Sequence, residues 1–374
     1  MSASRLGVGV IGCGHICATY LANAPLFRWM EMRACADLRP EAAQAQAERF
    51  DLRAETVEGL FEADDIDILV NLTVPAAHFE VSRRALLAGK HVYSEKPFVL
   101  STGDGKALLD LAQSRGLRIG SAPDTFFGGT HQLARKLIDD GAVGRIASGT
   151  CFFQSPGMEM WHPNPDFFFR PGGGPILDMG PYYIANLVQL LGPVERVAAT
   201  SSMAKSERLI TSAPRHGEKI TVETPTTVQA LLHFESGAQV TFCASWDVWQ
   251  HGHSNMELYG EHGTLHVPDP NFFGGELRMT EHGSFVNAPG WDHPFGRSNR
   301  DDGQANYRAA GLADMAQAII EDKPHRCSAA FSLHVVDALT SIMQSAEESR
   351  FIDIETRCDR PEPLGPEDAR ALLA

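Results

Sequence analysis

Lys96 is the residue whose type and position best suit chemistry. It follows a short apolar alternation at 91–93 and stands between Glu95 and Pro97. Pro97 has no N–H and biases Lys96 toward an extended backbone, so we expect Lys96 at the carboxyl end of a strand. Ligands of open α/β sheets bind at that edge, and a lysine there can relay a proton if its surroundings lower its basicity. The alternative is a surface lysine before a turn.

A glycine-rich turn follows the first apolar segment of the chain. Gly12 and Gly14 match the first two positions of the G-x-G-x-x-G dinucleotide motif, and Cys17 occupies the third position. The first glycine permits a tight turn, and the second lets the backbone approach a pyrophosphate. The third position requires a small residue, which cysteine satisfies less well than glycine. We assign cofactor binding to the two glycines and to His15 and Ile16, which follow Gly14 directly.

A second apolar segment, 30–36, ends in Asp37. An acidic residue about 20 positions beyond the glycines hydrogen-bonds the ribose 2′-hydroxyl of NAD. A carboxylate there repels a 2′-phosphate, so we expect NAD, with NADP still possible because Arg39 is close. Both residues are therefore candidates for cofactor binding. Asp37 could instead cap the helix expected at 41–50.

Further strands and helices alternate through the first third of the chain. The apolar segment 66–72 predicts a buried strand, and Thr73, Pro75 and His78 follow it before another helix. We expect these three residues near the cofactor, although His78 could be an ordinary helix-turn residue. Strands that alternate with helices at this spacing predict an α/β fold with a doubly wound parallel sheet.

Four motifs together resemble the Gfo/Idh/MocA family of oxidoreductases, which includes glucose–fructose oxidoreductase and inositol dehydrogenase. They are Val-Ile-Gly-Cys-Gly-His-Ile (10–16), Ala-Asp (36–37), Leu-Thr-Val-Pro-Ala-Ala-His (72–78) and Glu-Lys-Pro (95–97). The resemblance implies an N-terminal Rossmann domain, which we place at 1–122. It also implies a C-terminal α/β domain with a large open, mostly antiparallel sheet, which we place at 123–374 as the substrate-binding and oligomerisation domain.

The resemblance also implies an activity. Members of the family typically oxidise a secondary hydroxyl of a sugar or cyclic polyol with NAD(P), or run the reverse reaction. The lysine of their Glu-Lys-Pro motif acts in proton transfer, which assigns that role to Lys96 and places Glu95 beside the cofactor.

Asp178 and Tyr182 are the candidate partners of that lysine. They are four residues apart, so they share one face of a helix expected to run from Asp178 to Leu191. The family usually shows Asp-x-Gly-x-His here, whereas this chain has Gly-Pro-Tyr-Tyr at 180–183. A tyrosine is a poorer base than histidine but can still donate a hydrogen bond to the substrate. We therefore expect a family branch in which Lys96, aided by His162, carries more of the proton transfer.

Two further segments contain candidate substrate contacts. Trp161 and His162 stand in a proline-rich loop, and sugar rings need both an apolar face and polar edges. We therefore predict that both residues contact the substrate, although the loop could be merely structural. Asp124 lies where the two domains are expected to meet and is a candidate substrate ligand, with an N-cap-like turn residue as the alternative.

Period-two alternation between 194 and 267 predicts antiparallel strands with one buried face, including a hairpin at 256–267. Such a large exposed sheet face usually finds a partner, so we expect a homodimer or homotetramer. We read 272–305 as a long loop. His251 and His253 lack a third ligand at fixed spacing, so we predict no metal site.

Bulk composition excludes several classes of function. The net charge of −15 argues against a nucleic-acid or anionic-membrane surface. Seven scattered cysteines suit a reducing compartment, and we expect neither a signal peptide nor a membrane-spanning helix, hence a cytoplasmic protein.

The leading hypothesis is an NAD-dependent dehydrogenase acting on a sugar, a sugar derivative or a polyol. The alternatives are a glycosidase that transiently oxidises its substrate through retained NAD, and a non-catalytic sugar-sensing regulator.

Overall fold

The structure is a computed structural model that describes residues 5–374, apart from the side chain of Asn287. The described chain forms two compact units. The first comprises residues 5–129, Asp292–Val336 and Pro361–Ala374, and the second comprises Thr130–Trp291 and Asp337–Arg360. This division differs from the predicted domains 1–122 and 123–374, because two later segments return to the first unit.

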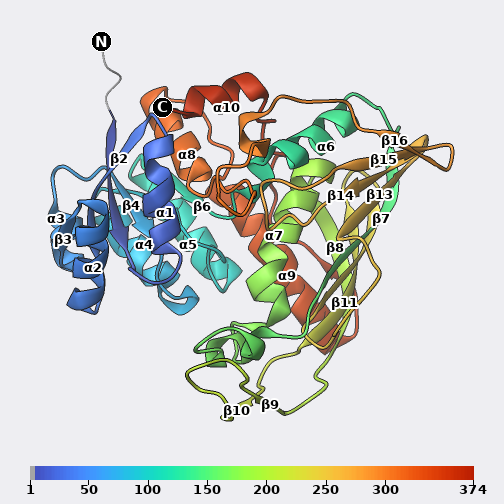
Figure 1. The fold of residues 1–374 in the computed structure, drawn as a ribbon, viewed down its shortest axis with the longest axis horizontal. Coiled ribbons are helices and arrows are strands. Elements are labelled where there is room, and N and C mark those ends of the chain that lie inside the picture. Colours follow the sequence, from blue (N-terminus) through green and yellow to red (C-terminus); the bar gives the residue numbers. More distant parts are fainter. Residues whose placement is uncertain (1–4) are drawn as a thin grey trace. The chain divides into compact units, whose positions relative to one another are not determined.

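A six-stranded parallel sheet forms the centre of the first unit (Figure 1), with the strand order β3-β2-β1-β4-β5-β6. The strands are β1 (Leu6–Ile11), β2 (Met30–Ala36), β3 (Arg53–Glu55), β4 (Ile68–Asn71), β5 (His91–Ser94) and β6 (Ile119–Ser121). Every neighbouring pair is parallel. The predicted doubly wound Rossmann sheet is therefore confirmed.

Helices connect these strands and pack on them, for example α4 on β4 and β5 and α2 on β2. They are α1 (Cys17–Asn23), α2 (Pro40–Phe50), α3 (Val57–Glu62), α4 (His78–Leu87) and α5 (Thr102–Ser114). Side-chain caps start two of them: the Ser101 hydroxyl accepts from the Asp104 N–H at 3.1 Å, and Thr56 accepts from the Gly59 N–H at 2.9 Å. The apolar faces of strands and helices form one continuous core.

The returning segments add α8 (Ala310–Ile320) and α10 (Pro366–Leu372) to the first unit. A buried ion pair anchors them: Arg326 lies 2.5 Å from the Asp314 carboxylate and also donates its backbone N–H to it at 2.7 Å. Arg326 also pairs with Asp368 on α10, at 3.2 Å. Arg326 therefore ties α10 to α8.

A nine-stranded sheet forms the second unit, in the order β16-β15-β14-β13-β7-β12-β11-β8-β17 (Figure 1). Only β7 and β12 pair in parallel, so the prediction of a mostly antiparallel sheet is confirmed. Its strands are β7 (Ile146–Gln154), β8 (Val194–Ser202), β11 (Thr227–Phe234), β12 (Gln239–Ser245), β13 (Met256–Gly260), β14 (Gly263–Val267), β15 (Arg278–Glu281), β16 (Ser284–Asn287) and β17 (Ile352–Asp353).

Helix α7 (Gly174–Leu191) covers one face of this sheet, where it contacts β7, β11 and β12. The alternation in β11 places Val228, Ala230 and Leu232 in the core and leaves Gln229 and Leu231 exposed on the other face. Helix α6 (Gly129–Asp139) precedes the sheet, and α9 (Ala329–Glu348) has its C-terminal half in this unit.

Two expectations about this unit are wrong. The segment 272–305 is not one long loop, because β15 and β16 form a hairpin that extends the sheet beyond the predicted β13–β14 hairpin. Helix α7 begins at Gly174 rather than Asp178, because Gly174 with φ +82° and Pro175 start it one turn earlier. Among residues 5–374, no helix is long and apolar enough to cross a membrane.

Candidate cofactor and substrate sites

The glycine turn between β1 and α1 leaves space beside its backbone. Gly12 has a φ of +102°, and a Cβ there would lie 2.6 Å from the Leu72 carbonyl oxygen, so this position requires glycine. A Cβ on Gly14 would meet no heavy atom within 4 Å. Gly14 and His15 are exposed, and Ile16 is half-buried. The open space beside Gly14 is what the close approach of a pyrophosphate requires.

Asp37 lies directly beside this turn. One carboxylate oxygen accepts a hydrogen bond from the backbone N–H of Cys13 at 2.8 Å, and the other accepts from the backbone N–H of Arg39 at 2.9 Å. The Arg39 side chain is exposed, with Nε 3.8 Å from the carboxylate. The acidic group therefore lies where a ribose hydroxyl would approach the turn.

Asn71 organises the turn that follows β4. Its Oδ1 accepts from the Thr73 hydroxyl at 2.6 Å, and its Nδ2 donates to the His78 carbonyl oxygen at 3.0 Å. The His78 ring is fully buried, 2.7 Å from the Pro97 carbonyl oxygen and 3.1 Å from that of Thr73, and burial lowers its pKa. The His78 ring thus joins two turns of the first unit, and its place near the cofactor stays a prediction. Pro75 is half-buried in the same turn.

Glu95 and Lys96 follow β5. One Glu95 carboxylate oxygen accepts from the Tyr20 hydroxyl at 2.9 Å, and the other accepts from the Lys96 backbone N–H at 2.8 Å. The Glu95 N–H donates to the Asn71 carbonyl oxygen at 2.8 Å. Lys96 is half-buried and follows the carboxyl end of the strand, where the sequence places it.

These four turns meet at one edge of the sheet. Strands β2, β1, β4 and β5 are consecutive and parallel, so their carboxyl ends point the same way. Gly12, Asp37, Thr73 and Lys96 lie just beyond these ends. An open glycine, a carboxylate beside it and a polar strand-end turn are the features that bind a dinucleotide. The residues present therefore suit NAD.

Asp178 and Tyr182 lie one turn apart on α7, in the second unit. Asp178 is half-buried and Tyr182 is largely buried. The neighbouring Tyr183 has a different place, because its hydroxyl donates to Asp269 at 3.0 Å and accepts from Asn255 at 3.2 Å. Tyr183 is therefore a hydrogen-bonded core residue of the second unit.

The loop with Trp161 and His162 carries a cluster of aromatic rings. Trp161 is 64% exposed, and its ring stands at 79° to that of His162 with centroids 5.4 Å apart. Phe167 and Phe168 meet the same imidazole edge-on, at 5.5 and 5.1 Å. His162 Nδ1 accepts from the Asn164 N–H at 3.1 Å, which places the proton of the neutral ring on Nε2. The cluster thus offers an exposed apolar face beside a polar donor.

A short hairpin of β9 (Glu207–Leu209) and β10 (Lys219–Thr221) holds that loop. The buried Arg208 donates to Glu159 at 2.8 Å and forms an ion pair with Asp247. The Ser212 hydroxyl donates to the His162 carbonyl oxygen at 2.6 Å. These bonds fix the backbone that presents the aromatic cluster.

Asp124 lies in a turn of the first unit. It is buried in the first unit, and one carboxylate oxygen accepts from the N–H groups of Ala309 and Gly311, both at 3.0 Å. Burial raises its pKa to about 6, against the opposing effect of those hydrogen bonds. Ala309 has a φ of +88°, so Asp124 holds a strained turn at the start of α8. These bonds favour the alternative of a turn residue, and substrate binding by Asp124 stays a prediction.

The candidate residues thus form two groups, one in each unit. Tyr20 and Asn71 were missed from the sequence, although both bond to residues of the first group. Asn71 did leave a signal, because it is a polar residue near the end of a mostly apolar strand. Tyr20 left none, since an aromatic residue in an apolar helix is indistinguishable from ordinary core.

His251 and His253 stack on one another, and His253 stacks on Phe152. Among residues 5–374, no group of three or more His, Cys, Asp or Glu side chains could hold a metal ion.

Comparison with known families agrees with this geometry. Residues 6–122 match the model of an oxidoreductase family with an NAD-binding Rossmann fold, GFO/IDH/MocA, and residues 131–266 match a C-terminal domain of the same family. The chain belongs to the Gfo/Idh/MocA family. The resemblance found in the four sequence motifs is therefore confirmed.

Relatives with named activities act on sugars or polyols. A dTDP-3,4-didehydro-2,6-dideoxy-alpha-D-glucose 3-reductase of Streptomyces violaceoruber is 33% identical over 196 residues, 51% of this chain and 56% of that protein. The levoglucosan dehydrogenase of Pseudarthrobacter phenanthrenivorans is 28% identical over 286 residues, 70% of this chain and 72% of that protein. The chain thus matches little more than half the length of the first of these Gfo/Idh/MocA relatives.

A solved structure of levoglucosan dehydrogenase in complex with NADH and L-sorbose shares the fold. The TM-score is 0.80 with 24% identity, over 94% of this chain and 100% of that one. At this identity the likeness supports the two-domain family architecture alone.

Proposed function

We propose that this Gfo/Idh/MocA protein is an NAD-dependent oxidoreductase. It transfers hydride between nicotinamide and a secondary hydroxyl or carbonyl of a sugar, a sugar derivative or a cyclic polyol. The observation that carries the proposal is Lys96, which lies at the same sheet edge as the glycine turn and Asp37 and has its backbone held by Glu95. The sugar- and polyol-active relatives support this substrate class.

The residues divide the chemistry between them. Bound nicotinamide supplies the hydride acceptor or donor. Lys96 takes the proton of the substrate hydroxyl during oxidation and returns it during reduction. Asp178 and Tyr182 hold the reacting hydroxyl, with Tyr182 as a hydrogen-bond donor in the place of the usual family histidine. His162 binds a neighbouring hydroxyl through Nε2, and Trp161 stacks on the apolar face of the ring.

We also propose NAD over NADP as the working cofactor. The Asp37 carboxylate beside the glycine turn suits a ribose diol and repels a phosphate. Arg39 is exposed and already lies near that carboxylate, so it offers only weak compensation.

A turnover assay tests the function. Purified protein is mixed with NAD or NADP and a panel of sugars and cyclic polyols, and the absorbance of reduced nicotinamide is followed beside a Lys96→Met variant. We expect reduction with one substrate class and a loss of about 10²–10⁴-fold in the variant, which should still bind NADH. Glycoside cleavage without net NADH formation would favour the NAD-retaining glycosidase. Sugar binding without either reaction would favour the sensor.

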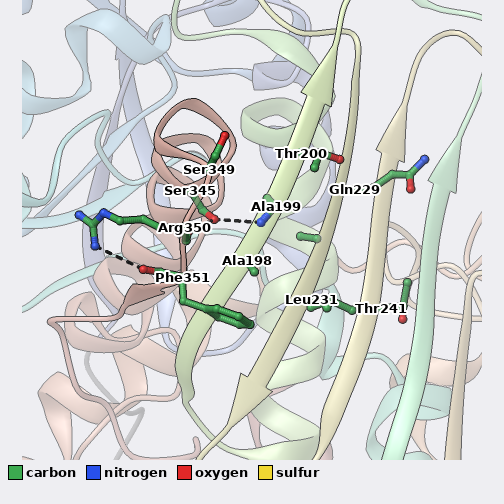
Figure 2. Close-up of a pocket in the computed structure, with 11 residues that line it drawn as sticks. Ala198, Ala199, Thr200, Gln229, Leu231, Thr241, Ser345, Ser349, Arg350 and Phe351 are labelled. Carbon is green, nitrogen blue, oxygen red and sulfur yellow. Dashed lines mark hydrogen bonds between the residues drawn. The ribbon is translucent and has the colours of Figure 1, made fainter.

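We further propose that the open face of the second sheet joins copies of this chain as a homodimer or homotetramer. Figure 2 shows this face, with Thr200, Gln229, Leu231 and Thr241 on neighbouring strands. Leu231 and Phe351 are about half exposed there, beside a hollow of about 440 Å³. Exposed apolar side chains on a broad sheet face are typical of an isologous interface.

The seven free cysteines support the cytoplasm as the compartment.

A further inference from the structure

Tyr20 connects the helix after the glycine turn to the strand end that carries Lys96. It is fully buried on α1, four residues beyond Ile16. Its hydroxyl donates to one oxygen of Glu95 at 2.9 Å, and the other oxygen of Glu95 accepts the Lys96 backbone N–H at 2.8 Å. The Glu95 carboxylate is thus fixed at both oxygens, once by α1 and once by the backbone of Lys96.

This arrangement leaves Glu95 little freedom. Its backbone N–H is also bound to the carbonyl oxygen of Asn71 on the adjacent strand β4. A carboxylate with both oxygens bound, on a residue whose backbone N–H is bound to β4, cannot swing away without breaking a hydrogen bond. The orientation of the Lys96 backbone therefore depends on where α1 holds the Tyr20 hydroxyl.

We propose that Tyr20 is a positioning residue, which couples the cofactor-binding turn to Lys96 through Glu95. The proposal rests on the proposed function, because it assumes that Lys96 is the proton-transfer group. A cofactor on the glycine turn orders the start of α1, and α1 in turn fixes Tyr20, Glu95 and the strand end. Proton transfer needs its groups placed to within a fraction of an ångström, so loosening this chain of bonds reduces turnover more than cofactor binding.

The alternative is that Tyr20 only fills space, and a second tyrosine allows the two roles to be separated. Tyr93 is also fully buried in the first unit, and its hydroxyl lies beside the Cys327 thiol. Tyr20→Phe and Tyr93→Phe each remove one buried hydroxyl from the same unit. Only Tyr20→Phe removes a bond to Glu95.

The first experiment measures kcat and the Kd for NADH for the wild type and the two variants. With Tyr20→Phe we expect kcat to fall about tenfold, as the loss of one hydrogen bond to a charged group allows, and the Kd for NADH to stay within about twofold. With Tyr93→Phe both values should match the wild type. Equal kcat for the two variants would overturn the proposal.

The second measurement does not need turnover. The extent of Lys96 acylation by a limiting amount of acetic anhydride is followed against pH by mass spectrometry. Without the Tyr20 donor, the Glu95 carboxylate that binds the Lys96 backbone is held on one side only, so we expect the midpoint to move by about 0.5 pH unit in Tyr20→Phe. In Tyr93→Phe the midpoint should not move, and identical midpoints in all three proteins would contradict the proposal.

The two measurements separate failure of the inference from failure of the proposed function. If the wild type oxidises no sugar or polyol but the acylation midpoint shifts only in Tyr20→Phe, the function is wrong, and only the coupling of Tyr20 to Lys96 through Glu95 stands. If the wild type turns over and both variants behave alike in both assays, the function stands and Tyr20 is only a core residue.

Discussion

The Asp37 carboxylate accepts a hydrogen bond from the backbone N–H of Cys13 at 2.8 Å, which ties the end of β2 to the glycine turn. We therefore expect Asp37→Ala to weaken NAD binding about tenfold, because it removes the ribose acceptor. Binding of NADP should improve, since the charge that repels its 2′-phosphate is gone. Titration of both cofactors measures this, with Asp37→Asn as a control that keeps an acceptor but not the charge. Equal affinity of the wild type for NAD and NADP would refute the assignment.

Substitution by alanine should have different effects at Gly12 and at Gly14, on stability and on NADH affinity respectively. Gly12→Ala forces a side chain into a positive φ and to within 2.6 Å of the Leu72 carbonyl oxygen, so we expect about 2 kcal/mol or more of lost stability. Gly14→Ala meets no protein atom within 4 Å, so its melting temperature should match the wild type. Because the new methyl group occupies the space of the pyrophosphate, its affinity for NADH should fall at least about tenfold. Thermal unfolding and NADH titration distinguish the two, and unaltered NADH affinity in Gly14→Ala would place the dinucleotide elsewhere.

Tyr182 takes the place of the usual family histidine on α7. If its hydroxyl donates to the substrate, Tyr182→Phe should lower kcat/KM about tenfold, the cost of one hydrogen bond to a partly charged oxygen. The midpoint of the pH–rate profile should stay in place, because Tyr182 does not take up the proton. Tyr183→Phe is the matched control, since that hydroxyl is bound to Asp269 and Asn255. It should lower the melting temperature and leave kcat/KM unaltered, and the same activity loss in both variants would argue against substrate contact by Tyr182.

The parts of the fold set by local pattern could be predicted from the sequence. Alternating strands and helices with a glycine turn specify the first sheet, and period-two alternation such as that of β11 specifies the second. The return of 292–336 and 361–374 to the first unit could not be predicted, because it depends on distant pairs such as Arg326 with Asp314. The hairpin of β15 and β16 lies in a stretch rich in glycine and polar residues, where alternation is weak.

The candidate site, too, could be predicted from the sequence only in part. Spacing after a strand or a glycine places Gly12, Asp37 and Lys96 at one sheet edge, because parallel strands end at the same side. Spacing gives no information on which polar groups a fold turns inward. His78 and Asp124 stand in suitable places along the chain, yet backbone groups of the first unit satisfy both. The role of Tyr20 is apparent only from the hydrogen bond that its hydroxyl donates to Glu95, which is 75 positions away in the sequence.

His131 makes the stability of the second unit depend on pH. It is fully buried beside the Phe272 carbonyl oxygen, and burial lowers its pKa from 6.5 to about 4. The unfolded chain therefore binds a proton between pH 6.5 and 4 that the folded chain does not, so stability falls as the pH drops through this window. From pH 7 to pH 5 we expect a loss of about 2 kcal/mol from this residue. Urea unfolding of wild type and His131→Gln checks it, because the variant should lose less stability over the same range.

The exposed His216 in the same unit provides the control for that experiment. His216→Gln should keep the full pH slope of the wild type, since folding does not bury the His216 side chain. If the free energy of unfolding of His131→Gln falls with pH as steeply as that of the wild type, other groups cause the pH dependence.

Leu231 and Leu209 allow a test of the proposed assembly. Both are leucines of the second unit with about the same exposure, 50% and 51%, but Leu231 lies on the open sheet face and Leu209 on the hairpin of β9 and β10. A charge buried at an interface is costly, so Leu231→Glu should give monomers at low micromolar concentration. Leu209→Glu should keep the mass of the wild-type oligomer in size-exclusion chromatography with light scattering. A monomeric wild type, or dissociation by Leu209→Glu instead, would rule out the open face as the interface.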